Sequence, residues 1–289
     1  MNRKEVAHQF RARVMQIRAN LKADHRKRME PQLNFPSPSP AIERYGRHCP
    51  ICHEKRDVNA PDAVTNCCCQ LVCHGCQSRF HDAFLPCPLC GIHLRSEAEQ
   101  VKGIHRFADE EWDPLAMRTL GEHYRDGCMG LEPDAEKQVH YVRLACELGE
   151  PEAGVILAMM YMEGDCIARD DREALVWYTF AAYAGDAKGQ FMLACHKERT
   201  ANRCRNKAGL EEAARWVLLS AEQGFLQAMY KMGAFYANGV GVRKDRAASK
   251  LWYTKATTTE CCQSLEASEI EKNREHVREM ETAVPPAAP

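Results

Sequence analysis

Cysteine is the residue type whose number and spacing predict chemistry in this chain. Nine of the 16 cysteines in the 289-residue sequence fall within residues 49–90, namely Cys49, Cys52, Cys67, Cys68, Cys69, Cys73, Cys76, Cys87 and Cys90. Six of them form three Cys-x-x-Cys pairs, and each pair places two sulfurs on one tight turn, as a tetrahedral zinc site requires. Two zinc sites need eight ligands, so the triplet in CCCQLVCHGC, residues 67–76, must supply two more. The spacing therefore predicts two structural zinc ions and leaves open which two cysteines of the triplet bind.

The composition limits the class of protein. The formal net charge is -1, 45% of the residues are hydrophobic, and no apolar run is long enough for a signal peptide or a membrane span. We therefore expect a soluble intracellular protein, cytoplasmic or nuclear, in which clustered cysteines bind metal rather than form disulfides. The sequence shows no nucleophile–base pattern, phosphate-binding glycine loop or zinc-hydrolase helix.

The cysteine-rich segment resembles a RING-type zinc finger, with CPIC at 49–52 opening it and CPLC at 87–90 closing it. The resemblance implies a cross-brace, in which the first and third ligand pairs share one zinc ion and the second and fourth pairs share the other. One site would contain Cys49, Cys52, Cys73 and Cys76. The other would contain Cys87, Cys90 and two members of the triplet.

The triplet departs from the common form of that family. Gln70 stands where many RING fingers have a histidine ligand, so the segment resembles the all-cysteine variants. In those variants a ligand lies five positions before the fifth ligand, which implies Cys68, with Cys67 as its partner. Cys69 is the alternative ligand, because a Cys67/Cys69 pair would avoid the crowding of adjacent ligands. Two histidines are weaker substitutes: His74 and His81.

The resemblance also implies a docking surface for a ubiquitin-conjugating enzyme. RING-type ubiquitin ligases form no covalent intermediate, and they act by positioning the ubiquitin that the conjugating enzyme carries. The docking residues would be Ile51, Phe80, Pro88 and Leu89. The arginine that often follows the last ligand and contacts ubiquitin is replaced by Gly91, which argues against ligase activity but not against zinc binding.

The second half of the chain is an internal repeat. At a constant offset of 75 residues, matching residues include Tyr161 with Tyr236, Gly164 with Gly239 and Trp177 with Trp252. Weaker copies begin near residue 114 and span 187–225, so four units are predicted. In each unit, small residues and aromatics lie on one stripe of two helices, a glycine ends the first helix, and Asp170 or Asp171 begins the second. Stacked hairpins of this kind form an α-solenoid whose concave face binds other molecules.

The pattern resembles Sel-one-like repeats, which are related to tetratricopeptide repeats. That resemblance implies a scaffold for protein complexes, with a protein substrate or partner on the solenoid. The aromatic stripe is expected to be core.

The predicted fold is mainly α, with a small cross-brace module followed by the solenoid. The predicted segments are a basic arm at 1–46, the RING-type finger at 47–95, a linker at 96–111, four repeats at 112–257, and a charged helix with an unfolded tail at 258–289. The arm could bind RNA, anionic lipid or an import receptor, but a solvated arm is the simpler interpretation. Nucleic-acid binding is not expected, because few basic residues lie between the cysteines.

Two hypotheses follow. In the first, the chain is a ubiquitin ligase or ligase subunit that binds the conjugating enzyme through its finger and the substrate through its repeats. In the second, it is a non-catalytic scaffold with a structural zinc module.

Overall fold

The structure is a computed structural model that describes residues 12, 15, 48–54, 56, 63–65, 67–81, 86–92 and 96–258. The predictions for the basic arm, apart from Ala12 and Met15, and for the tail after Thr258 lie outside these residues. The chain divides into two compact units. One contains the described residues up to Gly189, and the other contains those from Gln190 onward.

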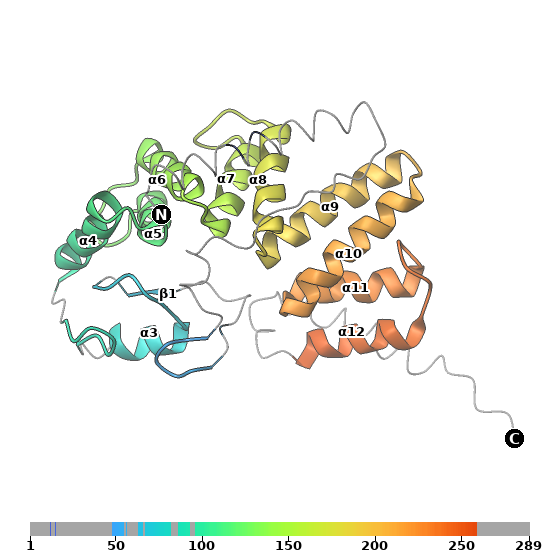
Figure 1. The fold of residues 1–289 in the computed structure, drawn as a ribbon, viewed down its shortest axis with the longest axis horizontal. Helices are drawn as coiled ribbons and strands as arrows, with labels where there is room; N and C mark the ends of the chain where they lie inside the picture. Colours follow the sequence, from blue (N-terminus) through green and yellow to red (C-terminus); the bar gives the residue numbers. More distant parts are fainter. Residues whose placement is uncertain are drawn as a thin grey trace, which may run out of the picture. The chain divides into compact units, whose positions relative to one another are not determined.

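Four consecutive helical hairpins account for most of residues 112–258, which confirms the prediction of a mainly helical α-solenoid (Figure 1). They are α5 (Pro114–Asp126) with α6 (Ala135–Glu147), α7 (Pro151–Glu163) with α8 (Asp171–Tyr183), α9 (Ala187–Arg203) with α10 (Lys207–Gln223), and α11 (Leu226–Asn238) with α12 (Arg246–Thr258). None of the described helices is long and apolar enough to span a membrane.

Short-range signals set the ends of these helices. Six carboxylates accept hydrogen bonds from backbone N–H groups of the first turn: Asp113, Asp134, Glu150, Asp170, Asp186 and Asp245. The cap of α8 is therefore Asp170, with Asp171 as the first helical residue. Gly164 and Gly239 end α7 and α11 in the left-handed region, with φ of 73° and 75°, as the sequence predicts.

The repeated apolar residues form the cores of the hairpins. Trp177, Tyr178, Trp252 and Tyr253 are all buried, so the aromatic stripe is core, as expected. The matching pair Tyr161 and Tyr236 is the exception, because both are half-buried, and the Tyr161 hydroxyl accepts a hydrogen bond from Arg143 at 3.3 Å. Alanines at the hairpin contacts have no exposed surface, which lets the paired helices approach closely: Ala153, Ala174, Ala181, Ala228 and Ala256.

The weakest repeat, 187–225, forms the longest hairpin. Its helices α9 and α10 have 17 residues each, against 13 in the other repeat helices. No glycine ends α9; Arg205 takes the left-handed conformation instead, with φ of 50°. The added length and the missing glycine explain why the repeat pattern is hard to follow there.

The segment 96–111, expected to be a linker, is helical. Ser96 begins α4 (Glu97–His105) by accepting a hydrogen bond from the Glu99 N–H group, and a π-helical turn, η1 (Arg106–Glu110), follows. The spacing Ser-x-x-Glu, here Ser96 and Glu99, is a capping-box signature of a helix start.

This helix covers the first repeat through two buried tyrosines. The rings of Tyr124 and Tyr141 are stacked with centroids 5.9 Å apart. The Tyr124 hydroxyl lies 3.3 Å from His105 Nε2, and the Tyr141 hydroxyl donates to Asp109 Oδ1 at 3.1 Å. The segment 96–111 is therefore the N-terminal cap of the solenoid.

The cysteine-rich module is a short hairpin followed by a helix. Strand β1 (Ala63–Val64) pairs antiparallel with β2 (Leu71–Val72), placing Ala63 opposite Val72, and α3 (His74–His81) follows. The triplet lies in the turn between the strands, which is closed by a hydrogen bond from Cys69 N to the Thr65 carbonyl at 2.8 Å.

A buried cation links the first two hairpins. The side chain of Arg118 on α5 is 2% exposed and lies among three carboxylates. Its Nη1 is 3.0 Å from Glu122 Oε1 and 3.2 Å from Glu152 Oε2, and its Nε is 3.7 Å from Glu150 Oε2. Glu150 and Glu152 lie at the start of α7, so this cluster ties α5 to the next repeat.

Glu150 is expected to make stability depend on pH. Burial raises the pKa of its carboxyl group to about 7, although the charge of Arg118 opposes the shift. Because the folded pKa exceeds the ordinary glutamate pKa of 4.5, the stabilisation is complete below about pH 4.5 and is lost as the pH rises through about 7. Glu150→Gln should reduce the slope of the unfolding free energy against pH by up to about 1.4 kcal/mol per pH unit. Urea unfolding at several pH values between about 4.5 and 7 measures this slope. Glu136→Gln, on the exposed face of α6, is the control, and equal slopes in both variants would contradict the assignment.

Candidate functional site

Eight cysteine sulfurs gather into two compact sets within the described part of the module. The first set contains Cys49, Cys52, Cys73 and Cys76, and the second contains Cys67, Cys68, Cys87 and Cys90. In each set the four sulfurs all lie within 4.8 Å of one another. The sets alternate along the chain, so each draws on two separate segments.

The sulfur spacing fits a tetrahedral ion. Four sulfurs bound to zinc at about 2.3 Å lie about 3.8 Å apart. The Sγ–Sγ distance is 3.7 Å from Cys52 to Cys73 and 3.8 Å from Cys68 to Cys87. Both distances are far longer than the about 2.05 Å of a disulfide bond. All of these cysteines are free thiols, so both sets of sulfurs are available as ligands.

The first and last Cys-x-x-Cys turns have the same backbone conformation. Cys49 N donates to the Glu54 carbonyl at 2.8 Å, and Cys87 N donates to the Ile92 carbonyl at 2.9 Å. The residue after each turn is left-handed, with φ of 61° at His53 and 72° at Gly91. A glycine at position 91 therefore suits the conformation of the turn, whereas a larger residue there would be strained.

Ionisation of the thiols depends on their surroundings. Burial and neighbouring cysteines raise the pKa of Cys76 to about 12. For Cys68, burial is again the largest cause, and the pKa rises to about 11. Burial alone would raise the pKa of Cys49 too, but backbone hydrogen bonds from Cys73, Cys52 and Ile51 outweigh the effect of burial. The pKa of the Cys49 thiol is therefore lowered to about 6. Metal ligation requires thiolates, so the charge of a bound dication would have to offset the cost of deprotonating the buried thiols.

The third cysteine of the triplet lies outside both sets. Cys69 is 4% exposed, is left-handed with φ of 50°, and donates its thiol hydrogen to Asp113 Oδ1 at 3.5 Å. Burial raises the pKa of this thiol, and the Asp113 charge adds to the shift, so Cys69 is a neutral donor. The same Oδ1 accepts the N–H groups of Leu115 and Ala116 at the start of α5. Cys69 therefore joins the cysteine module to the first repeat, a role that its spacing did not indicate.

We expect the three cysteines of the triplet to differ in zinc content when substituted. Cys67→Ser and Cys68→Ser should each lose one of two zinc ions, because each removes a sulfur from the second set. Cys69→Ser should keep both, because its side chain contacts Asp113 instead. Native mass spectrometry measures the zinc content of each variant. Loss of zinc from Cys69→Ser, with Cys67→Ser unchanged, would mean that Cys69 is a ligand.

The residues expected to dock a conjugating enzyme are not equally accessible. Pro88 and Leu89 are exposed, as is a further apolar residue of the same segment, Ile92. Ile51 is half-buried and packs on the small cluster of Cys49, Val72 and Cys76. The side chains of Phe80, His74 and His81 lie outside the described part of the structure, and the Gln70 amide donates to the Cys68 carbonyl at 3.4 Å.

Two comparisons report related sequences. The family model described as Sel1 repeat matches residues 114–150, 152–186 and 226–258, which leaves the module at 47–95 and the long hairpin at 187–225 outside the match. Chitin synthase regulator SKT5 of Saccharomyces cerevisiae is 28% identical over 171 residues, covering 58% of this chain and 24% of that protein. The protein of the same name in Malassezia restricta is 28% identical over 136 residues, covering 45% of this chain and 9% of its own. This chain therefore matches a quarter or less of the length of either relative.

A solved structure supports the fold. The crystal structure of a Sel1 repeat protein from Oxalobacter formigenes superposes with a TM-score of 0.51 at 21% identity, covering 65% of this chain and 81% of that one. Together with the capped helical hairpins and their buried aromatic stripe, this similarity shows that the helical part of the chain is an α-solenoid, in which three of the four hairpins match the Sel1 repeat.

Proposed function

We propose that this protein is an interaction scaffold, in which Sel1 repeats bind partner proteins and a zinc-loaded cysteine module forms a second binding surface. The match of three hairpins to Sel1 repeats carries this proposal. The buried aromatic stripe serves the core, which leaves the turns and the outer helix faces for partners. The name of the SKT5 relatives describes regulators of another protein, which agrees with a role in binding.

Cross-linking tests the scaffold. The tagged full chain, cross-linked in cells and analysed by mass spectrometry, should give reproducible links from partner proteins to lysines of the repeat helices, such as Lys188, Lys207 and Lys250, which are exposed. Links confined to residues 47–95 would contradict binding by the repeats.

The proposed metal content is two structural zinc ions. Three features of the cysteine module support it: two sets of four sulfurs, Sγ–Sγ distances near those of a tetrahedral site, and two Cys-x-x-Cys turns of matching conformation. The eight proposed ligands are Cys49, Cys52, Cys73 and Cys76 for one ion and Cys67, Cys68, Cys87 and Cys90 for the other. Zinc would hold the separate segments together, while the chain itself supplies little apolar core.

Recruitment of a ubiquitin-conjugating enzyme is a second candidate function. The alternation of the two cysteine sets, as in a RING cross-brace, and the exposure of Pro88 and Leu89 favour it. Gly91 disfavours ubiquitin transfer, because it lacks the side chain that often clamps ubiquitin. In this role the chain would provide positioning only.

Self-ubiquitination with a panel of conjugating enzymes tests this second function. Leu89→Ala should abolish activity, whereas Ile92→Ala should retain it, because both side chains are exposed but only Leu89 holds a docking position of the family. These variants are better probes than Ile51→Ala, since Ile51 also packs in the module's core. No activity with any enzyme on the panel, from protein holding two zinc ions, would leave the scaffold as the function.

A further inference from the structure

Positive charge is concentrated at the helix turns of the second unit. Residues 199–210, at the α9–α10 turn, contain four basic residues and no acid: Arg199, Arg203, Arg205 and Lys207. Residues 239–250, at the α11–α12 turn, contain four basic residues and one acid: Arg243, Lys244, Arg246 and Lys250, with Asp245. All eight basic side chains are exposed. The chain as a whole has a net charge of only -1, so this local excess is not a property of its composition.

The corresponding turns of the first unit have the opposite charge. Residues 125–134 contain one basic residue and three acids, and residues 163–172 contain two basic residues and four acids. The repeat architecture therefore does not require basic turns. The excess is specific to the last two hairpins.

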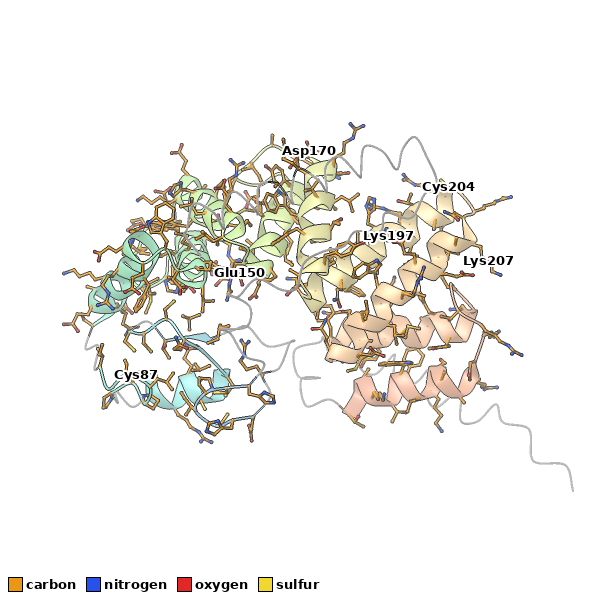
Figure 2. All side chains as sticks on the ribbon, viewed as in Figure 1. Cys87, Glu150, Asp170, Lys197, Cys204 and Lys207 are labelled. Carbon is orange, nitrogen blue, oxygen red and sulfur yellow. The ribbon has the colours of Figure 1, made fainter. Side chains whose placement is uncertain are left out.

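The α11–α12 turn lies against the first turn of α10, the helix that directly follows the α9–α10 turn. Gly241 has φ of 64°, and a Cβ added there would overlap the carbonyl oxygen of Leu210, near the start of α10. The α11–α12 turn is thus packed on the backbone of the neighbouring hairpin. Figure 2 shows Cys204 and Lys207 at the end of the α9–α10 hairpin. We call this surface, made by residues 199–210 and 239–250, the basic edge.

Four acidic residues lie in or next to the basic edge: Glu198, Glu211, Glu212 and Asp245. Three of them have partners of their own, among them Glu198 with Lys231 at 2.7 Å, whereas Glu211 is exposed and places one negative charge at the border of the edge. Asp245 Oδ1 accepts the N–H groups of Ala247 and Ala248 at 2.9 and 3.0 Å, so the carboxylate caps α12. Glu212, which follows the α9–α10 turn, pairs with Lys197 at 2.7 Å. Backbone hydrogen bonds hold the α9–α10 turn, including Asn206 N to the Ala201 carbonyl at 2.8 Å, so the cations project from a defined backbone.

A recess adjoins the charges. An open cavity of about 730 Å³ is lined by Tyr236 and by the α11–α12 turn, including Arg243, Lys244 and Arg246. The Tyr236 carbonyl accepts a hydrogen bond from Asp245 N at 3.0 Å, which fixes one wall. A narrow chain with anionic side chains could enter this recess, whereas the flat surface of a membrane could not.

We propose that the basic edge binds an acidic peptide segment of a partner protein, rich in Asp and Glu or phosphorylated. The proposal rests on the scaffold function and names the chemistry of one partner. A membrane fits less well, because none of the large apolar side chains exposed in the described residues belongs to either turn. A single-stranded nucleic acid fits less well too, because stacking needs exposed aromatic rings and Tyr236 is half-buried.

Fluorescence anisotropy tests whether the basic edge of the full, zinc-loaded chain binds acidic peptides. The probes are a labelled Asp- and Glu-rich peptide, the same peptide carrying phosphoserine, labelled single-stranded poly-uridine RNA, and, by co-sedimentation, phosphatidylcholine vesicles containing phosphatidylserine. Both peptides should bind, with an affinity that falls as salt rises. Tighter binding of the phosphorylated peptide would identify phosphate as the preferred group, and equal binding would identify carboxylates as sufficient.

Paired charge reversals localise the site. Arg243→Glu with Lys244→Glu should weaken peptide binding about tenfold, and Arg203→Glu with Lys207→Glu should do the same, since each adds repulsion where there was attraction. Arg172→Glu with Lys102→Glu reverses two exposed charges of the first unit and should change nothing beyond a factor of about two. Circular dichroism should show equal helix content in all variants.

Three results would overturn the proposal: no binding of either peptide, equal weakening by the control pair, or RNA or vesicles binding more tightly than the peptides. Absence of peptide binding while the cellular cross-links to the repeats persist would contradict the basic edge alone. Absence of those cross-links would contradict the scaffold itself.

Discussion

Removal of zinc is expected to unfold the cysteine module and leave the repeat helices folded. The buried cluster of the module consists of Cys49, Val72 and Cys76, with Ile51, Cys52 and Cys73 packed on it, too little apolar surface to hold the separate segments. Binding of a structural zinc ion contributes roughly 10–16 kcal/mol to the folding of small metal-bound domains. Each of the two sites is expected to contribute a free energy of that order. The repeats have their own core and should keep their helix content.

Hydrogen exchange with mass spectrometry, before and after chelation, measures this prediction. Amides of residues 63–81 should lose protection, whereas those of α7 and α8 should keep it. Cys128→Ser with Cys204→Ser removes two exposed thiols outside both sulfur sets and should bind zinc normally. Unchanged protection of residues 63–81 in the metal-free protein would show that zinc is not needed for the fold of the module.

Loss of the Arg118 side chain is expected to destabilise the first unit by about 3–5 kcal/mol. Arg118→Met keeps much of the volume but leaves the buried Glu150 carboxylate beside Glu122 and Glu152 without the cation that they share. Of the three carboxylates only Glu150 is buried, with 8% of its side chain exposed against 30% for Glu122 and 37% for Glu152. The cost therefore lies in leaving Glu150 desolvated without its counter-charge.

Arg125→Met is the matched control on the same helix. Arg125 also pairs with a carboxylate, Asp126 at 2.7 Å, but both side chains are about half exposed. Its loss should cost at most about 1 kcal/mol. Urea unfolding monitored by circular dichroism at neutral pH compares the two variants. Similar losses in both would mean that burial of Arg118 does not strengthen its ion pairs.

Periodic features of this fold could be predicted from the sequence. The buried aromatics at 177, 178, 252 and 253, the left-handed glycines at 164 and 239, and an aspartate cap for α8 all follow from local rules that act within a few residues. The sequence left that cap open between Asp170 and Asp171. The sulfurs group in the alternating pattern that the RING resemblance implies, whereas spacing alone left the members of the triplet open, and zinc binding stays a prediction.

Features that depend on distant residues could not be predicted. The contact between Cys69 and Asp113 spans 44 residues, and no spacing rule connects a cysteine to a helix cap. The Arg118 cluster was missed because a lone arginine on an amphipathic helix is usually solvated. The cap at 96–111 was missed because its apolar residues are few, although Ser96 and Glu99 marked its start.

The N-terminal cap has a consequence for how this array could lengthen during evolution. Repeat proteins grow by duplication, and a new hairpin must pack on the exposed side of an old one. Before α5 that side is occupied, because α4 and η1 place His105 and Asp109 against Tyr124 and Tyr141. A copy inserted there would separate both tyrosines from their partners, whereas a copy inserted between α6 and α7 would meet helices of its own kind. The number of repeats is therefore free to change inside the array but not at its beginning.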